Sequence, residues 1–120
     1  MPEFELGAVQ ARFAELLWQR VPIGSGEVVR LCAEQFGWKK STTYTVLHKL
    51  EEKGLFRNDG GTVKACLTRE QFNAGKSEQV VSESFGGSLP AFVAAFTAKN
   101  ELTAREAEEI RAMIDRFRKA

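Results

Sequence analysis

The segment LFRNDGGTVKACL, residues 55–67, restricts the fold of this chain more than any other. Residues 55–57 and 62–67 have strand-like composition, and the NDGG between them is a strong signal for a tight β-hairpin. The chain before this segment has the apolar spacing of helices. Few common architectures place a hairpin directly after two helices that are joined by a turn.

Two helices are expected in the first third of the chain. Apolar residues recur with helical spacing between residues 4 and 19, and VPIG at 21–24 interrupts the pattern. A second helix is predicted to begin with Ser25 as its N-cap and to stop at Gly37, since glycine readily adopts the left-handed conformation that ends a helix.

A third helix is predicted in WKKSTTYTVLHKLEEKGLF, residues 38–56. Ser41 or Thr42 would cap it, and Gly54 would end it. Residues spaced three, four and seven apart form a stripe that we expect to be buried: Thr43, Val46, Leu47 and Leu50. The opposite face then carries hydroxyl, imidazole and ammonium groups instead of apolar ones.

Charge is distributed unevenly along the 120 residues, although the net charge is only +1. Residues 39–69 carry seven Lys or Arg and three Asp or Glu, whereas acidic residues are in excess on both sides of this segment. Cys32 and Cys66 lie far apart, and no apolar segment approaches the ~20 residues of a membrane span. These features predict a cytoplasmic protein with reduced thiols and without a membrane partner.

The order of elements and the basic middle third together predict a winged helix-turn-helix domain that binds double-stranded DNA. Side chains near the start of a recognition helix reach base edges, while lysines and backbone N–H groups hold phosphates. The expected base contacts are Ser41, Tyr44, Thr45 and His48, and the expected phosphate contacts are Lys39, Lys40, Lys49 and Lys64. Lys53 also belongs to the predicted DNA-binding set, and Arg57 continues the basic track into the hairpin.

Other functions remain open at this point. Any surface helix displays polar groups, so the same face could be merely solvated or could dock an acidic protein as a winged-helix interaction module. His48 is the only histidine, and no Ser/His/Asp set, Gly-rich phosphate loop or paired carboxylate stands out. We therefore expect neither catalysis, nor a metal site, nor a cofactor.

The chain after residue 68 returns to helical patterns. TREQ at 68–71 and TARE at 103–106 fit capping boxes, and Ser88 can cap a helix that follows the break at Gly86-Gly87. We expect residues 1–68 to form the DNA-binding domain and residues 69–120 a helical dimerisation region. The predicted dimer interface consists of Leu89, Phe92, Val93, Phe96, Ile110, Met113, Ile114 and Phe117, although these side chains could instead complete a monomer core.

Five motifs in order resemble the penicillinase and methicillin-resistance repressor family (BlaI/MecI/CopY-like winged-helix regulators). They are LLW before a short turn, GW before a Thr-x-x-Thr helix, L..KG at the end of that helix, FGGS, and LT..E.EEIR. The resemblance implies a transcriptional repressor with an N-terminal winged helix on palindromic operator DNA and a homodimer formed by the last helices. It places Thr42, Thr45 and Lys49 at the family's hydroxyl and basic positions of the recognition helix, which adds Thr42 to the predicted DNA-binding set.

The chain departs from the family's usual residues at Lys40, Ser41 and Tyr44, which puts the operator sequence in doubt. Antibiotic-responsive members are cut by a sensor protease at an Asn-Phe bond in the first dimer helix, and the matching bond here is Ala95-Phe96. Copper-responsive members carry cysteines near the C-terminus, whereas this chain has none after Cys66. Copper sensing is therefore not expected, and a sensor protease is a candidate partner.

Overall fold

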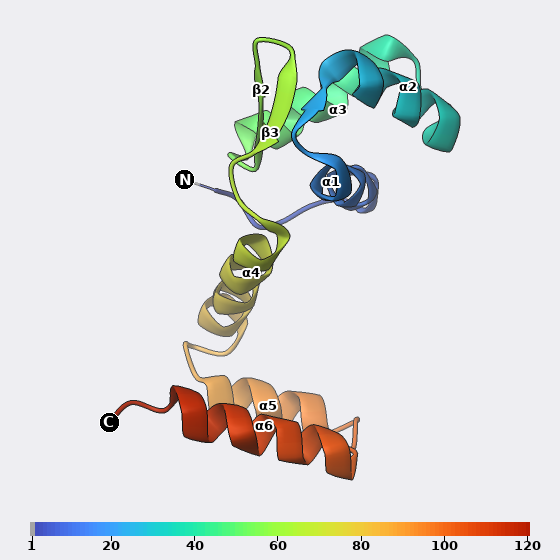
Figure 1. Ribbon diagram of the computed structural model, residues 1–120. Helices are drawn as coiled ribbons and strands as arrows, with labels where there is room; N and C mark the ends of the chain where they lie inside the picture. Colours follow the sequence, from blue (N-terminus) through green and yellow to red (C-terminus); the bar gives the residue numbers. More distant parts are fainter. Residues whose placement is uncertain (1) are drawn as a thin grey trace. The chain divides into compact units, whose positions relative to one another are not determined.

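The computed structural model describes residues 2–120 and is mainly α-helical in that range, with one small antiparallel sheet (Figure 1). The elements are α1 (Ala8–Arg20), β1 (Ile23–Gly24), α2 (Ser25–Phe36), α3 (Lys40–Glu52), β2 (Phe56–Asp59), β3 (Thr62–Ala65), α4 (Arg69–Ser84), α5 (Leu89–Thr97) and α6 (Ala104–Phe117). The predicted fold class, a winged helix-turn-helix followed by C-terminal helices, is confirmed.

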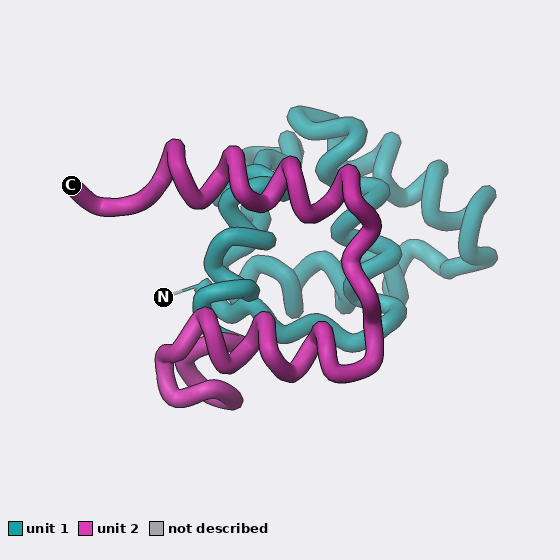
Figure 2. The backbone as a smooth tube through the Cα atoms, turned by 90° about the horizontal axis from the view of Figure 1, so that it is seen from below, with its two compact units in different colours: residues 1–79 teal, residues 80–120 magenta. Residues whose placement is uncertain are grey.

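The chain divides into two compact units, residues 1–79 and 80–120 (Figure 2). The division falls inside α4, whereas the sequence suggested a boundary after residue 68. Residues 69–79 of α4 belong to the first unit, and Phe72, only 5% exposed, is part of that unit's core.

The predicted hairpin is present and forms the wing of the first unit. Asp59 pairs with Thr62, so only Gly60 and Gly61 make the turn, with φ angles of 61° and 93°. Two consecutive positive φ angles are what a two-residue hairpin turn requires, and glycine adopts them without steric penalty. The strand order β1-β3-β2 adds a strand that the sequence did not predict. With two residues, β1 is too short to show an alternating pattern.

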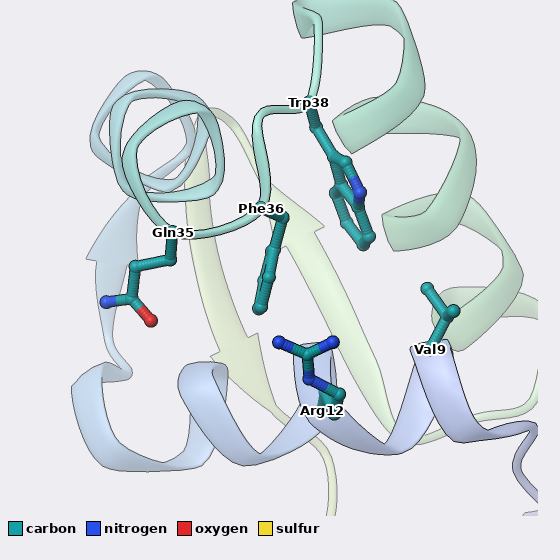
Figure 3. A pocket seen from close by; sticks show the side chains of 5 residues that line it. All are labelled: Val9, Arg12, Gln35, Phe36 and Trp38. Carbon is teal, nitrogen blue, oxygen red and sulfur yellow. The ribbon is translucent and has the colours of Figure 1, made fainter.

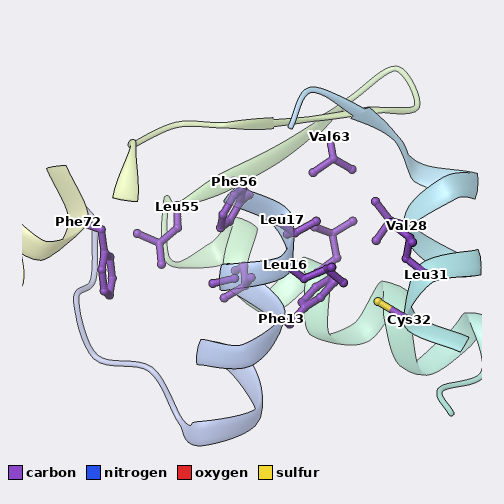
Figure 4. Close-up of a cluster of buried hydrophobic side chains, with 13 residues drawn as sticks. Phe13, Leu16, Leu17, Val28, Leu31, Cys32, Leu55, Phe56, Val63 and Phe72 are labelled. Carbon is purple, nitrogen blue, oxygen red and sulfur yellow. The ribbon is translucent and has the colours of Figure 1, made fainter. Parts of the chain in front are cut away.

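The core lies entirely in the first unit (Figure 4). The buried hydrophobic residues come from α1, α2, α3, the hairpin and α4: Phe13, Ala14, Leu16, Leu17, Val28, Leu31, Cys32, Leu47, Leu50, Leu55, Phe56, Val63 and Phe72. Trp18 joins three of these elements. Its ring lies 5.2 Å from Phe56 and 5.3 Å from Phe72, and its indole N–H donates to the Leu67 carbonyl at 3.0 Å.

Helix starts are the main correction to the sequence predictions. α1 begins at Ala8 rather than near residue 4, and Phe4 and Leu6 instead lie in an N-terminal segment that packs against the core. α2 begins one residue early, with Gly24 as its N-cap. α3 begins at Lys40 with Lys39 as N-cap, so neither Ser41 nor Thr42 caps it. The Gly37 stop is confirmed, with a φ of 68°.

The second unit contains the end of α4 and the antiparallel helices α5 and α6 (Figure 1). The predicted caps are confirmed. The Ser88 hydroxyl accepts from Ala91 N–H at 3.1 Å, and Thr103 and Glu106 form a reciprocal capping box. Neither α5 nor α6 has a buried residue. Local capping thus specifies these helices, while their own unit leaves their apolar faces largely uncovered.

Candidate nucleic-acid interface

The start of α3 is fixed by an aromatic cluster. Trp38, the residue before the N-cap, lies 5.5 Å from the Phe13 ring in α1 and 4.8 Å from Phe36 at the end of α2. The Arg12 guanidinium lies 5.1 Å from the centroid of the Phe36 ring, in the range of a cation–π interaction. The linker between α2 and α3 therefore has a defined course, which positions the first turn of α3.

A hollow of about 240 Å³ opens beside this cluster (Figure 3). α1 contributes Val9 and Arg12, the end of α2 contributes Gln35 and Phe36, and the linker contributes Trp38. The hollow is smaller than the usual pocket for a small organic ligand. Its aromatic walls serve the packing of the α2–α3 turn.

The buried face of α3 consists of Thr43, Leu47 and Leu50, which confirms three members of the predicted stripe; Val46 is half-buried. The Thr43 hydroxyl donates to the Lys39 carbonyl at 3.3 Å. Burial raises the pKa of the neighbouring Cys32 thiol, and a hydrogen bond with Thr43 opposes that shift more weakly. Cys32 is thus a neutral core residue.

The outward face of α3 is the exposed set Ser41, Thr42, Thr45, His48 and Lys49, with Lys39 and Lys40 at its start. The Thr45 hydroxyl donates to the Ser41 carbonyl at 2.9 Å, and its exposed oxygen can still accept a hydrogen bond. The Nε2 atom of His48 lies 3.7 Å from a carboxylate oxygen of Glu52, one turn later in α3. Within residues 2–120, the side chains of the three lysines make no hydrogen bond or ion pair.

Two cations at the start of α3 are unfavourable for the isolated helix. The helix dipole is positive at that end, so each charge there costs roughly 0.3–1 kcal/mol. Lys39 also provides no side-chain cap, so the N–H groups of the first turn remain available to an external acceptor. An anion at this position would remove the repulsion and accept these hydrogen bonds, as phosphates do at helix N-termini.

The wing brings two further cations together. Arg57 and Lys64 are directly opposite each other in the β2–β3 register, so their side chains lie on the same face of the sheet. Like charges at such positions destabilise a sheet unless an anion lies between them. The Lys64 ammonium lies 3.4 Å from a carboxylate oxygen of Asp59, whereas the Arg57 side chain is exposed. The sequence indicated this basic track, but the pairing is visible only in the structure.

One hydrogen bond joins the wing to α3 and a second closes the hairpin turn, and neither was predicted. The Glu51 carboxylate in the last turn of α3 accepts from the Asn58 backbone N–H at 3.2 Å. The Asn58 side chain accepts from the Gly61 N–H at 3.0 Å, which closes the hairpin turn. Since both contacts depend on polar side chains that accept from backbone N–H groups, no hydrophobic pattern could reveal them.

Two predicted DNA-binding residues differ from the others in their surroundings. Tyr44 is half-buried and packs against the core, so only part of its ring lies on the outward face. The Lys53 ammonium, just after α3, donates to the Glu5 carbonyl. The structure therefore gathers the remaining predicted residues of α3 on one exposed face and places Lys64 separately on the wing.

The predicted dimer residues are arranged differently. Exposed large side chains of α5 and α6 include Leu89, Val93, Phe96, Ile110, Met113, Ile114 and Phe117, of which Phe117 is 72% exposed. Phe92 is half-buried because its ring makes an edge contact with Phe85, with 5.5 Å between the ring centroids.

In residues 2–120 no group of three or more His, Cys, Asp or Glu side chains could hold a metal ion.

Comparison with known proteins identifies the family. No helix in residues 2–120 has the length and hydropathy needed to cross a membrane. A search of curated proteins gave no significant match. A family model described as "Penicillinase repressor" matches residues 6–116, which covers most of both units and every element from α1 to the last turn of α6. This is a family of regulatory repressors and not of enzymes. The chain belongs to the penicillinase repressor family.

Proposed function

We propose that this protein represses transcription by binding palindromic operator DNA as a homodimer. In each copy α3 enters the major groove, and the wing contacts the flanking backbone. The observation that carries the proposal is the start of α3. Lys39 and Lys40 stand at the positive end of the helix dipole beside uncapped N–H groups, an arrangement that an anionic partner stabilises.

The side chains divide into two classes of contact. Ser41, Thr42, Thr45 and His48 project from the first three turns of α3 and would meet base edges, with Tyr44 at the margin. Phosphate contacts would come from Lys39, Lys40 and Lys49 on α3, from Lys64 on the wing, and from Lys53 beside it. The wing register adds Arg57 to this second class, because it lies opposite Lys64.

A second copy of this chain is the partner that best fits the apolar faces of α5 and α6. Two-fold pairing would bury the side chains that the second unit leaves exposed, and it would present two recognition helices to a palindromic site. We assign residues 1–68 to DNA binding and residues 69–120 to the connection and the dimer, in a cytoplasmic protein. A sensor protease that cuts at Ala95-Phe96, inside α5, would separate α6 from this interface and release the operator.

Duplex DNA selected by the protein from a random pool, then titrated at several salt concentrations, tests the proposal. Each neutralised phosphate contributes about −0.9 to the slope of log K against log salt concentration, so several contacts give a steep slope. A winged-helix module that docks on an acidic protein would select no duplex even at low salt, and that result would overturn the proposal.

The two classes of contact are separated by a matched pair of substitutions on α3. Lys49→Ala should weaken all duplexes about equally and reduce the magnitude of the salt slope by about one. Thr42→Ala should instead change the ranking of duplexes with different half-site sequences. If Thr42→Ala weakens every duplex by the same factor, the assignment of Thr42 to base recognition is wrong.

A further inference from the structure

A chain of three hydrogen bonds crosses the wing and joins it to both helices of the helix-turn-helix. The Asn58 N–H donates to the Glu51 carboxylate at 3.2 Å, and the Gly61 N–H donates to the Asn58 side-chain oxygen at 3.0 Å. The Gly61 carbonyl in turn accepts from the Ser25 N–H at 2.8 Å. Since Glu51 lies in the last turn of α3 and Ser25 is the first residue of α2, the chain runs from one helix across the wing to the other.

The two outer edges of the wing are held in different ways. In the strand order β1-β3-β2, β3 pairs with β1 on its outer side, whereas β2 is the edge strand. The N–H groups that point outward from an edge strand have no neighbouring strand as acceptor. In β2 the Asn58 N–H donates to the Glu51 carboxylate instead. Glu51 therefore attaches the uncovered edge of the wing directly to α3.

This attachment lies next to the cations of the wing. Side chains alternate along a strand, so Arg57 lies on the opposite face of the sheet from its neighbours Phe56 and Asn58, and directly opposite Lys64 in the register. On one side of Arg57, Phe56 is 1% exposed in the core, and on the other side Asn58 is bonded to α3. The backbone of Arg57 is thus held at both neighbours, while its side chain is exposed.

Electrostatics alone give no reason for a carboxylate at position 51. A negative charge within the basic segment 39–69 opposes the approach of an anionic partner. The other two acidic residues of this segment face cations or an imidazole, since Asp59 pairs with Lys64 and Glu52 lies near His48. Glu51 instead accepts from a backbone N–H of the wing. Its hydrogen bond accounts for the residue better than its charge does.

We propose that Glu51 is a positioning residue that holds the wing cations Arg57 and Lys64 at a fixed offset from α3. The inference rests on the proposed function, since it requires α3 and the wing to contact the same duplex. With the hydrogen bond in place, base contacts from α3 and phosphate contacts from the wing form together. Without it, the β2 edge moves independently of α3, and the wing cations contribute less to affinity.

Two substitutions separate the hydrogen bond of Glu51 from its charge. Glu51→Gln and Glu51→Ala both remove the negative charge, but only glutamine keeps an oxygen that can accept from the Asn58 N–H. The probe is the duplex selected by the wild-type protein, titrated at one salt concentration. Arg57→Ala should weaken binding by about fivefold in the wild-type and Glu51→Gln backgrounds, and by less than about twofold in the Glu51→Ala background.

A cation on α3 itself provides the control. Lys49→Ala removes a proposed phosphate contact that does not depend on the wing, so it should weaken binding by the same factor in all three backgrounds. Urea unfolding followed by tryptophan fluorescence shows that each variant is folded. Should Glu51→Ala not fold, Asn58→Ala breaks the next bond of the chain, and the same comparison applies to it.

Hydrogen exchange tests the bond in the absence of DNA. Amide exchange of the full-length protein, measured by nuclear magnetic resonance, should be slower at Asn58 in the wild-type and Glu51→Gln proteins than in Glu51→Ala by about fivefold. Exchange at the Leu47 amide in the middle of α3 should be the same in all three proteins.

The outcomes distinguish the inference from the proposed function. If the wild-type protein selects no duplex, the proposed function fails, and the inference fails with it. If the wild-type protein binds DNA but Arg57→Ala weakens binding equally in the Glu51→Gln and Glu51→Ala backgrounds, only the inference is overturned. The inference is also overturned if the effect of Lys49→Ala falls in the Glu51→Ala background as much as that of Arg57→Ala does, or if Asn58 exchanges equally fast in all three proteins.

Discussion

The two units of this protein differ in whether they bury their own hydrophobic residues. Residues 1–79 enclose a core in which Phe13, Cys32, Leu50, Leu55 and Val63 are all 0% exposed. Residues 80–120 bury nothing completely on α5 or α6, and Phe96 is 52% exposed. The first unit has the core of an independent domain. The second unit has well-capped helices whose apolar faces are exposed. Because a second copy of the chain would bury these faces, the stability of this unit should depend on protein concentration.

The largest predicted effect tests the first half of this comparison. Phe13→Ala should destabilise the first unit by about 3–5 kcal/mol, because it removes a buried ring from a core that cannot collapse fully around the gap. Both tryptophans, Trp18 and Trp38, lie in this unit, so their fluorescence follows its unfolding in urea. The fluorescence midpoint should be the same at high and low protein concentration. A strong concentration dependence would show that the first unit is not an independent domain.

A smaller effect, of about 2–4 kcal/mol, is expected for dimerisation in Phe96→Glu. Burial of a carboxylate in an apolar interface is unfavourable, so the chain should become monomeric by light scattering. Helix content should fall by circular dichroism, while the tryptophan unfolding transition stays in place. Lys99→Glu alters the charge of an exposed residue in the same unit and should leave the dimer intact. A dimer that persists in Phe96→Glu would contradict the assigned interface.

An effect of about 1 kcal/mol, with a sign that depends on the neighbouring side chain, is expected where the Phe4 ring of the N-terminal segment covers Gly75 of α4. Alanine normally stabilises a helix interior by about that amount relative to glycine. Gly75→Ala should nevertheless destabilise the first unit, because the new Cβ would displace the Phe4 ring. In the Phe4→Ala background the same substitution should become stabilising. Urea denaturation of the four proteins in this cycle gives the coupling, and equal effects in both backgrounds would contradict the contact.

These contrasts also show what the sequence could predict. The hairpin was predictable because NDGG has a local requirement that few other sequences meet, and Gly60 and Gly61 adopt the expected positive φ. The end of α2 at Gly37 and the capping boxes were predictable for the same reason. The start of α1 was not, because Phe4 and Leu6 continue its apolar spacing although they contact the core from an extended segment.

The candidate site was predictable in its outline and not in its contacts. Helical periodicity separates the buried Thr43 and Leu47 from the exposed Ser41 and Lys49. It does not place Tyr44, which lies at the margin where a small rotation of the helix decides burial. Pairing of Arg57 with Lys64 depends on strand register, which the turn length fixes. The contact of Phe4 with Gly75 joins residues from opposite ends of the first unit's sequence, and no local pattern encodes such a contact.

The two thiols connect the two halves of the comparison. Cys66 is exposed and should react at once with a thiol reagent, whereas Cys32 is buried and its raised pKa keeps it protonated. Reaction of Cys32 therefore requires the first unit to open, and its rate reports the stability of that unit. Phe13→Ala should raise this rate by about 100-fold or more, as expected from a loss of about 3 kcal/mol. Phe96→Glu should leave the rate nearly unchanged, because the exposed face it alters lies outside the core. If separating the dimer exposes Cys32 as well, the two units are energetically coupled, and the closed core of residues 1–79 is not sufficient for their stability.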